Sequence, residues 1–459
     1  MLKSHPHRNI VMGEGPLFKN VLFFSLPLML SGILQLLFNA ADTIVVGRFA
    51  GEEALAAVGS VGSLNALIVS LFIGLATGSN VVVARMMGAR DAKGVQDAIH
   101  TSVAISIICG IALAFIGFFL TRPLLLMMGS PEDVIDLSVL YVRIIFIGMP
   151  VQMVYNFCAA ILRAIGDTKR PLYFLTVSGV INVVLNLVLV LCFHMAVDGV
   201  AYATIISQAI SALLVIRSLM LRKDAVRLDL RRLRIVPSIL RQIVRIGLPS
   251  GIQGSLFAVS NVLIQSSLNS FGTLAMAGNA AAANIGSFVA QGVIAFMQAA
   301  TSFVSHNIGA RKPRRALNAM WCCQLWSFLF SAPLGLLAFV FGKQLLGLYN
   351  TDPEVIRWGM QRLLIVYLPY WITGFMEIFS GALRGIGSSL LPTIISLFGA
   401  CAFRILWIYT VFQKMRTMEC LLLSFPVSWI ITSIVMGSFF FVMYKHLCAQ
   451  HTPQELAAL

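Results

Sequence analysis

Residues 26–51 read LPLMLSGILQLLFNAADTIVVGRFAG, and this stretch decides the fold class. It is apolar over a length that crosses a bilayer as a helix, yet it contains one carboxylate, Asp42. At 1.5 Å per residue, Asp42 lies about 24 Å beyond Leu26, in the outer half of the span. An acid at such a depth usually faces a bundle interior or a wet cavity and marks an ion or substrate pathway. The alternative is a local pair with Arg48 near the membrane surface.

The composition excludes a soluble globular protein. The 459 residues are 58% hydrophobic and 11% charged, with a mean hydropathy of +0.89, whereas soluble domains average about 25% charged residues. The net charge of +15 would suggest nucleic acid in a soluble protein. Here the basic residues lie in short loops between apolar runs, so they indicate topology, and no nucleic-acid partner is expected. The polar N-terminus precedes a long first span, so we expect no cleaved signal peptide.

The eight cysteines indicate ordinary burial. None forms a CxxC motif and none has a His-Cys spacing typical of zinc. We therefore expect no metal site, apart from a possible Na⁺ at Asp42, and no cofactor.

Apolar segments near the 20 residues that a span needs recur along the whole chain. This predicts an all-α integral membrane protein with twelve transmembrane helices, at residues 19–47, 54–82, 97–120, 134–160, 171–193, 198–220, 241–270, 280–305, 316–341, 357–382, 391–413 and 420–445. Pro27 removes one backbone donor from the first span and is the predicted hinge.

The loops predict the orientation. With twelve spans, 24 Lys and Arg residues fall on the face of the N-terminus and eight on the opposite face. By the positive-inside rule, both termini are expected in the cytoplasm of a multi-pass protein of the cell membrane. The longest loop, 222–241, alternates apolar and basic residues, which suggests an amphipathic segment on anionic headgroups. The alternative for this loop, a more specific one, is a calmodulin-type or nucleic-acid site.

The chain contains an internal repeat. VARMMGAR at 83–90 returns as VSHNIGAR at 304–311, and LRAIG at 162–166 returns as LRGIG at 383–387, both after 221 residues. SLP at 25–27 returns as GLP at 247–249. Six spans per half is an even number, so the halves share an orientation, as in secondary transporters built from parallel repeats about a pseudo-two-fold axis. The predicted parts are an N-lobe at 1–221, a basic cytoplasmic linker at 222–240 and a C-lobe at 241–459. A duplicated scaffold that does not transport is the alternative.

The chain resembles the multidrug and toxic compound extrusion (MATE) family in five stretches. These are NAADTIVVGRFAGEEALAAVG at 39–59, VARMMGARDAKGVQDA at 83–98, LRAIGDTKRP at 162–171, GVAYATIISQ at 199–208 and GALRGIGSSLLP at 381–392. The resemblance implies a two-lobed bundle that exchanges an inward H⁺ or Na⁺ gradient for export of small organic, often cationic, compounds. Its expected partners are those compounds and the lipid bilayer, and the expected state is a monomer.

The resemblance also implies a cation or proton site in the N-lobe, made by Asp42, Asn156, Asn182, Asn186 and Thr204. Many members have a second acid at the position of Asn186. An amide there supplies no charge, so a proton route would depend on Asp42 alone, and a Na⁺ site would be weakened.

The C-lobe pattern of the family fits less well, because span 241–270 has no acid beyond Gly247. Glu377 is the only acid within the C-lobe spans, and Arg404 is the only base predicted to be deeply placed. They are either an ion pair or functional groups, with Glu377 as a counter-ion for a cationic substrate or a second proton site.

Polar residues recur on single faces of two C-lobe spans. Gln253, Phe257, Asn261 and Gln265 follow at intervals of four, and Asn284, Gln291, Gln298 and Ser305 at intervals of seven. These stripes either bond helices together or line a substrate cavity. The predicted cavity residues are Asn39, Met153, Gln253, Asn261, Asn284, Gln291, Glu377 and Arg404.

Other classes of function are less well supported by the sequence. No HExxH, GxSxG, Walker A or GxGxxG motif is present, which argues against a membrane enzyme. A passive channel would need a selectivity filter or charged ring that is not evident. A flippase of lipid-linked or amphipathic substrates remains an alternative within transporters.

Overall fold

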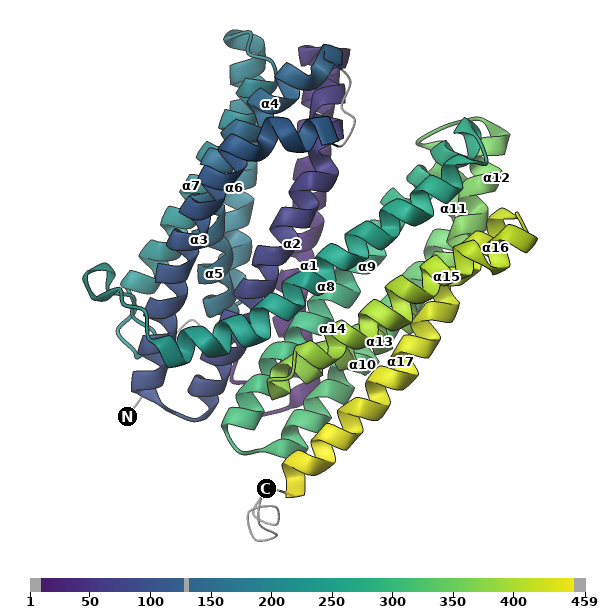
Figure 1. Cartoon of the computed structure of the whole chain (residues 1–459). Helices are drawn as coiled ribbons and strands as arrows, with labels where there is room; N and C mark the ends of the chain where they lie inside the picture. The colour runs from purple at the N-terminus through teal and green to yellow at the C-terminus, as the bar shows by residue number, and fades with distance from the viewer. Residues whose placement is uncertain (1–9, 128–131, 450–459) are drawn as a thin grey trace. The chain divides into compact units, whose positions relative to one another are not determined.

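A computed structural model describes residues 10–127 and 132–449, which form two compact helical units. One unit contains Leu30–Leu248, and the other contains Val11–Met29 together with the chain from Pro249 onward. Each unit is a bundle of long helices, coloured purple to teal and teal to yellow in Figure 1. Helices α1 (Leu17–Val45) and α8 (Pro237–Asn269) each contribute their two ends to different units.

The described residues of the first half of the chain form seven α-helices. Their bounds, with those of the π- and 3₁₀-helical segments, are α1 Leu17–Val45, η1 Val46–Ala50, α2 Glu52–Gly88, α3 Ala92–Met127, α4 Glu132–Ile147, α5 Met149–Ala164, α6 Lys169–Leu187, η2 Val188–Cys192, α7 Val197–Met220 and η3 Leu230–Arg232. Helix α5 packs on α2, α3 and α7, and α6 packs on α7. Pro27 is buried inside α1, which continues as an α-helix to Val45.

The second half repeats this order with more interruptions. Its elements are α8 Pro237–Asn269, α9 Thr273–Gly309, α10 Pro313–Val340, α11 Gly342–Gly347, α12 Pro353–Arg362, η4 Leu363–Tyr367, α13 Trp371–Ile386, α14 Leu390–Ser396, η5 Leu397–Ala402, α15 Phe403–Tyr409, α16 Val411–Lys414 and α17 Met418–Ala449. Helix α13 packs on α9, α10 and α17, which places it at the centre of this unit.

Two of the predicted single spans are bent. Helices α4 and α5 meet at 47°, and the stretch Pro353–Tyr367 meets α13 at 45°. Pro150 in the first turn of α5, and Pro369 before α13, cannot donate a backbone hydrogen bond. Sharp bends in helices are usually found at such prolines.

The predicted number of spans agrees with the structure. In the described parts of the chain, nine helices are long and apolar enough to cross a membrane, or eleven if each bent pair is one span. The remaining span is the 33-residue α8, which is less apolar because it contains Arg241, Arg245 and the Gln253 stripe. Together these make the twelve predicted spans.

The backbone confirms the repeat independently of the side chains. Helices α2 and α9 both have 37 residues and begin 221 residues apart. Left-handed backbone conformations recur at the same interval, since φ is 56° at both Arg90 and Arg311. These two arginines close matching turns between long helices, where such a φ is uncommon for a residue other than glycine.

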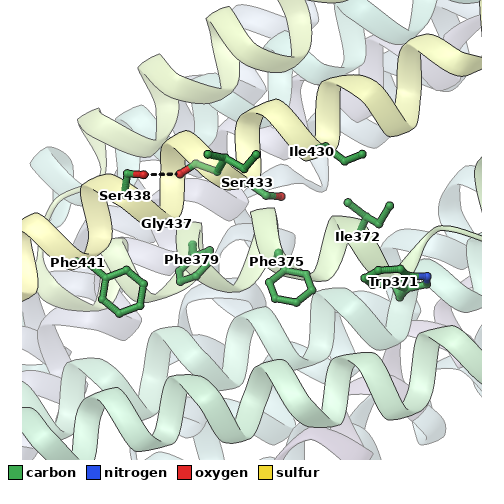
Figure 2. Close-up of a pocket in the computed structure, with 10 residues that line it drawn as sticks. Trp371, Ile372, Phe375, Phe379, Ile430, Ser433, Gly437, Ser438 and Phe441 are labelled. Atoms are coloured by element: carbon green, nitrogen blue, oxygen red, sulfur yellow. Dashed lines mark hydrogen bonds between the residues drawn. The ribbon is translucent and has the colours of Figure 1, made fainter.

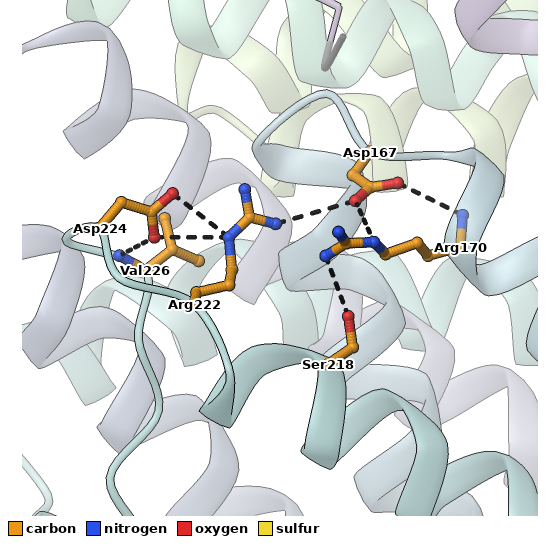
Figure 3. A network of polar contacts seen from close by, with 6 residues as sticks. All are labelled: Asp167, Arg170, Ser218, Arg222, Asp224 and Val226. Carbon is orange, nitrogen blue, oxygen red and sulfur yellow. Dashed lines mark hydrogen bonds and ion pairs between the residues drawn. The ribbon is translucent and has the colours of Figure 1, made fainter. Parts of the chain in front are cut away.

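The linker after α7 packs against its own unit with part of its apolar residues. Val226 and Leu228 are each 1% exposed and belong to the apolar core of the first unit. Arg222 Nη1 pairs with Asp167 Oδ2 at 3.7 Å, and its Nε pairs with Asp224 Oδ2 at 3.3 Å (Figure 3). The alternating pattern of the linker therefore reflects burial against the cytoplasm-facing ends predicted for α6 and α7.

Replacing Arg222 with alanine should release this linker. Arg222 bridges two carboxylates while its side chain is only 12% exposed, and hydrogen bonds to charged groups contribute about 1.5–3 kcal/mol. Amide hydrogen exchange of residues 224–234 should become at least about tenfold faster. Lys223→Ala, an exposed neighbour, is the matched control. Equal exchange in the two variants would contradict the bridging role of Arg222.

Candidate functional site

Asp42 makes a polar cluster with two amides of a neighbouring span. Asn186 Nδ2, on α6, donates to Asp42 Oδ1 on α1 at 2.5 Å, and it also lies 3.4 Å from Asn182 Oδ1. Asn186 is fully buried, Asn182 is 5% exposed and Asp42 is half-buried. The Oδ1 atom of Asn186 is buried without a hydrogen-bond partner. A partly buried carboxylate thus has a neutral donor as its partner.

This cluster lies beside an apolar layer. Val45 and Val46 follow Asp42 by one turn, and Val190 follows Asn186 by one turn. They pack with Val197 and Val200 of α7 in one buried cluster. Both α1 and α6 change to π-helix directly after the polar residues, at η1 and η2.

A glycine lets the two helices approach. A Cβ added to Gly179 of α6 would lie 1.8 Å from the ring of Phe38, which is one turn before Asp42. Phe38 therefore packs directly on the backbone of α6. This contact sets the distance at which Asp42 meets Asn182 and Asn186.

Gly179→Ala should therefore disturb the cluster through packing alone. Overpacking in a tight interior costs about 1–3 kcal/mol, and the forced shift acts on α1 next to Asp42. We expect a lower thermal midpoint and weaker transport in proteoliposomes. Gly347→Ala is the control, because its added Cβ would meet no heavy atom within 4 Å. Full transport by Gly179→Ala would show that the approach of α1 to α6 does not determine activity.

The other residues predicted for this site lie around the cluster without joining its hydrogen bonds. Asn156 is half-buried on α5 and has no hydrogen bond to Asp42, and Thr204 Oγ1 donates to Val200 O of its own helix at 2.9 Å. Asn39 is exposed. Arg48 is also exposed and forms no ion pair with Asp42, which removes the local-pair alternative.

The second unit contains a cavity of about 340 Å³. It is lined by Phe257, Asn261, Ile264, Gln265, Leu268, Arg362, Val366, Tyr367, Tyr370, Thr373, Met376, Glu377, Arg404, Phe425 and Trp429. Of the four residues that recur at intervals of four on α8, three line this cavity: Phe257, Asn261 and Gln265. The fourth, Gln253, is buried elsewhere and bonds helices together, donating to Ser396 Oγ at 2.9 Å.

Glu377 and Arg404 both line this cavity but do not pair with each other. Arg404 Nε donates to Ser428 Oγ at 2.9 Å, and Glu377 interacts electrostatically with Arg384, two turns further along α13. The ion-pair alternative is therefore wrong for this state. Arg384 was expected in a cytoplasmic loop, but it is 7% exposed inside α13, where its Nη2 donates to Gln253 Oε1 at 2.9 Å.

Besides Asn39 and Gln253, three further predicted cavity residues lie outside this cavity. Met153 is fully buried in the apolar core of the first unit. On α9, Asn284 is exposed and Gln291 is half-buried, and neither lines the cavity. The cavity also contains three residues that were not among the predicted cavity residues, Arg362, Tyr370 and Trp429. A local signal was available only for Tyr370, which lies two turns before Glu377.

A second hollow, of about 520 Å³, is an apolar groove between α13 and α17. Figure 2 shows Phe375, Phe379 and Phe441 pointing into it. It contains no charged side chain, so it offers no chemistry for an ion. Across the residues described, no three His, Cys, Asp or Glu side chains come together as a metal site.

These features define a class of protein: a multi-span helical membrane transporter of two repeated units, with a carboxylate site in one unit and a cavity in the other. The MatE family profile matches residues 27–188 and 249–410, which cover most of both halves. The chain belongs to this family. It is therefore a transporter, not an enzyme, and a passive channel or a flippase is not favoured.

Individual relatives agree with this membership. The chain is 32% identical to a probable multidrug resistance protein (YoeA) of Bacillus subtilis, over 83% of this chain and 84% of that protein. It is 26% identical to a protein of Shewanella oneidensis described as an FAD transporter, over 95% and 96%. A solved multidrug resistance MATE transporter in an outward-facing conformation has the same fold, with a TM-score of 0.90 at 23% identity over 97% and 100%.

Proposed function

We propose that this protein exports small organic compounds, drugs or toxic metabolites among them, in exchange for protons that bind at Asp42. The observation that carries the proposal is the buried cluster of Asp42, Asn182 and Asn186 inside two membrane spans. An intramembrane acid that faces other polar side chains is a functional site by default. The relatives described as multidrug resistance proteins support this substrate class. Because another relative is described as an FAD transporter, we do not restrict the proposed substrates to cations.

The partner of Asp42 favours a proton over Na⁺. The amide nitrogen of Asn186 presents its hydrogens to Asp42, and this positive end of the dipole opposes a metal cation at the same oxygen. When Asp42 is protonated, a rotated amide can accept from it through Oδ1, which otherwise has no partner. Asn186 can thus serve both protonation states of Asp42, whereas a Na⁺ site usually needs several converging oxygens.

Proton binding is coupled to transport because the charged and the neutral form of Asp42 favour different packing of α1. A charged Asp42 requires its polar partners, and a neutral one does not, so proton binding changes which packing of α1 is favoured. We place the bend at Pro27, two residues before the chain passes from one compact unit to the other. We propose that both termini lie in the cytoplasm, as the distribution of basic loops predicts, and that the monomer is the transporting form.

Purified protein in liposomes tests the proposal with two gradients imposed separately. Ethidium should accumulate against its concentration gradient when a pH gradient is imposed, and not when a Na⁺ gradient alone is imposed. Reversing the pH gradient should reverse the flux. Flux that only dissipates the ethidium gradient, whatever the pH on either side, would indicate a passive pore and overturn the exchange mechanism.

A further inference from the structure

Two arginines converge on one aromatic ring in the cavity of the second unit. Arg404 Cζ lies 4.5 Å from the centroid of Phe425, and Arg362 Cζ lies 5.7 Å from the same centroid. The arginines come from separate helices, α15 and α12. Arg404 is 3% exposed, and both side chains line the cavity of about 340 Å³.

Neither guanidinium has a protein carboxylate as its partner. No carboxylate of the described chain lies within 4.0 Å of Arg362 or Arg404. Arg404 is bonded only to the hydroxyl of Ser428, and Arg362 Nη1 to the side-chain oxygen of Asn279. The Nε of Arg362 is buried without any acceptor. A buried donor left unsatisfied carries a cost that a suitable ligand can remove.

The charge balance of the cavity is positive. Glu377 is the single acid of the cavity lining. Its carboxylate also interacts electrostatically with Arg384, which lies outside the lining. Two guanidinium groups that line one site of low dielectric repel each other, and the ring of Phe425 compensates only part of that cost. Bidentate binding of a carboxylate or phosphate is the interaction for which arginine is best suited.

The remaining walls are suited to a flat ring. The ring of Tyr370 lies 5.4 Å from that of Trp429 and 5.6 Å from that of Tyr367, measured between centroids. All three line the cavity, and Asn261 and Gln265 provide amide groups on the opposite helix α8. Apolar aromatic walls with a few convergent polar groups are typical of small-molecule sites.

We infer that this cavity selects small organic anions, compounds in which an aromatic ring carries a carboxylate or phosphate group. The oxyanion binds between Arg362 and Arg404, and the ring lies against Tyr370 and Trp429. The inference rests on the proposed export function and adds to it a second class of substrate, organic anions bound at this cavity, beside the cationic dye used as the transport probe. Organic cations are the disfavoured class at this cavity, since they would meet two like charges.

Equilibrium binding to the purified full-length protein tests this with a matched pair of probes. 2-Naphthoate and 2-naphthylmethylammonium share one ring system and differ in the sign of their charge. We expect 2-naphthoate to bind at least about tenfold more tightly. Arg404→Gln and Arg362→Gln should each weaken its binding by about tenfold or more, and Arg404→Lys by less. Arg357→Gln is the control, because Arg357 is exposed on α12 and pairs with Glu354.

Two results would overturn the inference: tighter binding of the cation than of the anion, or unchanged 2-naphthoate binding by both glutamine variants. Thermal unfolding of each variant identifies a protein that has lost its fold, and Arg362→Gln decides the matter if Arg404→Gln is unstable. Binding of 2-naphthoate is measured at equilibrium without any ion gradient, so it does not depend on proton-driven exchange. Binding without proton-driven transport would therefore reject the proposed exchange and keep this inference, and the reverse outcome would reject the inference alone.

Discussion

Asp42→Asn should reduce proton-driven accumulation of ethidium in proteoliposomes to the level of protein-free vesicles. The substitution keeps the size of the side chain and its ability to bond with Asn186, but it removes the only group of the cluster that can take up a proton. Because exchange requires the ion and the substrate to favour different states, a site that cannot change its charge cannot couple them. Passive equilibration of ethidium can continue, and only accumulation against the gradient should be lost.

The control for this prediction is Asp136→Asn, the same chemical change on α4. Asp136 is a surface residue whose side chain is 81% exposed, and it pairs with Arg122. It should accumulate ethidium as the wild type does. If Asp42→Asn still accumulated ethidium against its gradient at the wild-type rate, the proton would have to enter elsewhere, and Glu377 would be the first position to examine.

Features of the fold that depend on periodicity and length could be predicted from the sequence. The 221-residue repeat seen in VARMMGAR and VSHNIGAR recurs as equal helix lengths and matching turn geometry at Arg90 and Arg311. The bends were not predicted, because hydropathy does not distinguish one span of 27 residues from two helices that meet at 47°. Proline marks a possible bend. Pro27, however, lies in an uninterrupted helix, whereas Pro150 follows the sharp bend between α4 and α5.

The polar sites could be predicted only in part from the sequence. The pairing of Asp42 with the amides at 182 and 186 followed from the family resemblance, and the spacing of four only placed those amides on one face. Arg384 falls between two predicted spans, and Arg362 lies near the start of one, so neither was predicted to be a buried polar residue. Burial of their guanidinium groups depends on partners far away in sequence, such as Gln253 and Asn279, and no local pattern reports such contacts.

Asn186→Asp should create a sodium dependence that the wild type lacks. In the wild type, the amide donates to the single carboxylate, and both Asn182 and Asn186 are neutral. The substitution places a second carboxylate in a fully buried position beside Asp42. Two such groups cannot both be charged in a low-dielectric site without a cation between them, and the Oδ1 of Asn182 adds a third oxygen.

We therefore expect a Na⁺ gradient alone to drive ethidium accumulation by Asn186→Asp, at least about tenfold above the wild-type value. The thermal midpoint of the variant should rise with NaCl and not with choline chloride, because a ligand that binds only the folded state stabilises it. Asn318→Asp, on an exposed face of α10, controls for the added charge. A variant with unchanged proton coupling and no response to Na⁺ would mean that the side chain at 186 does not share an ion with Asp42, and the amide would then act only in holding α1 against α6.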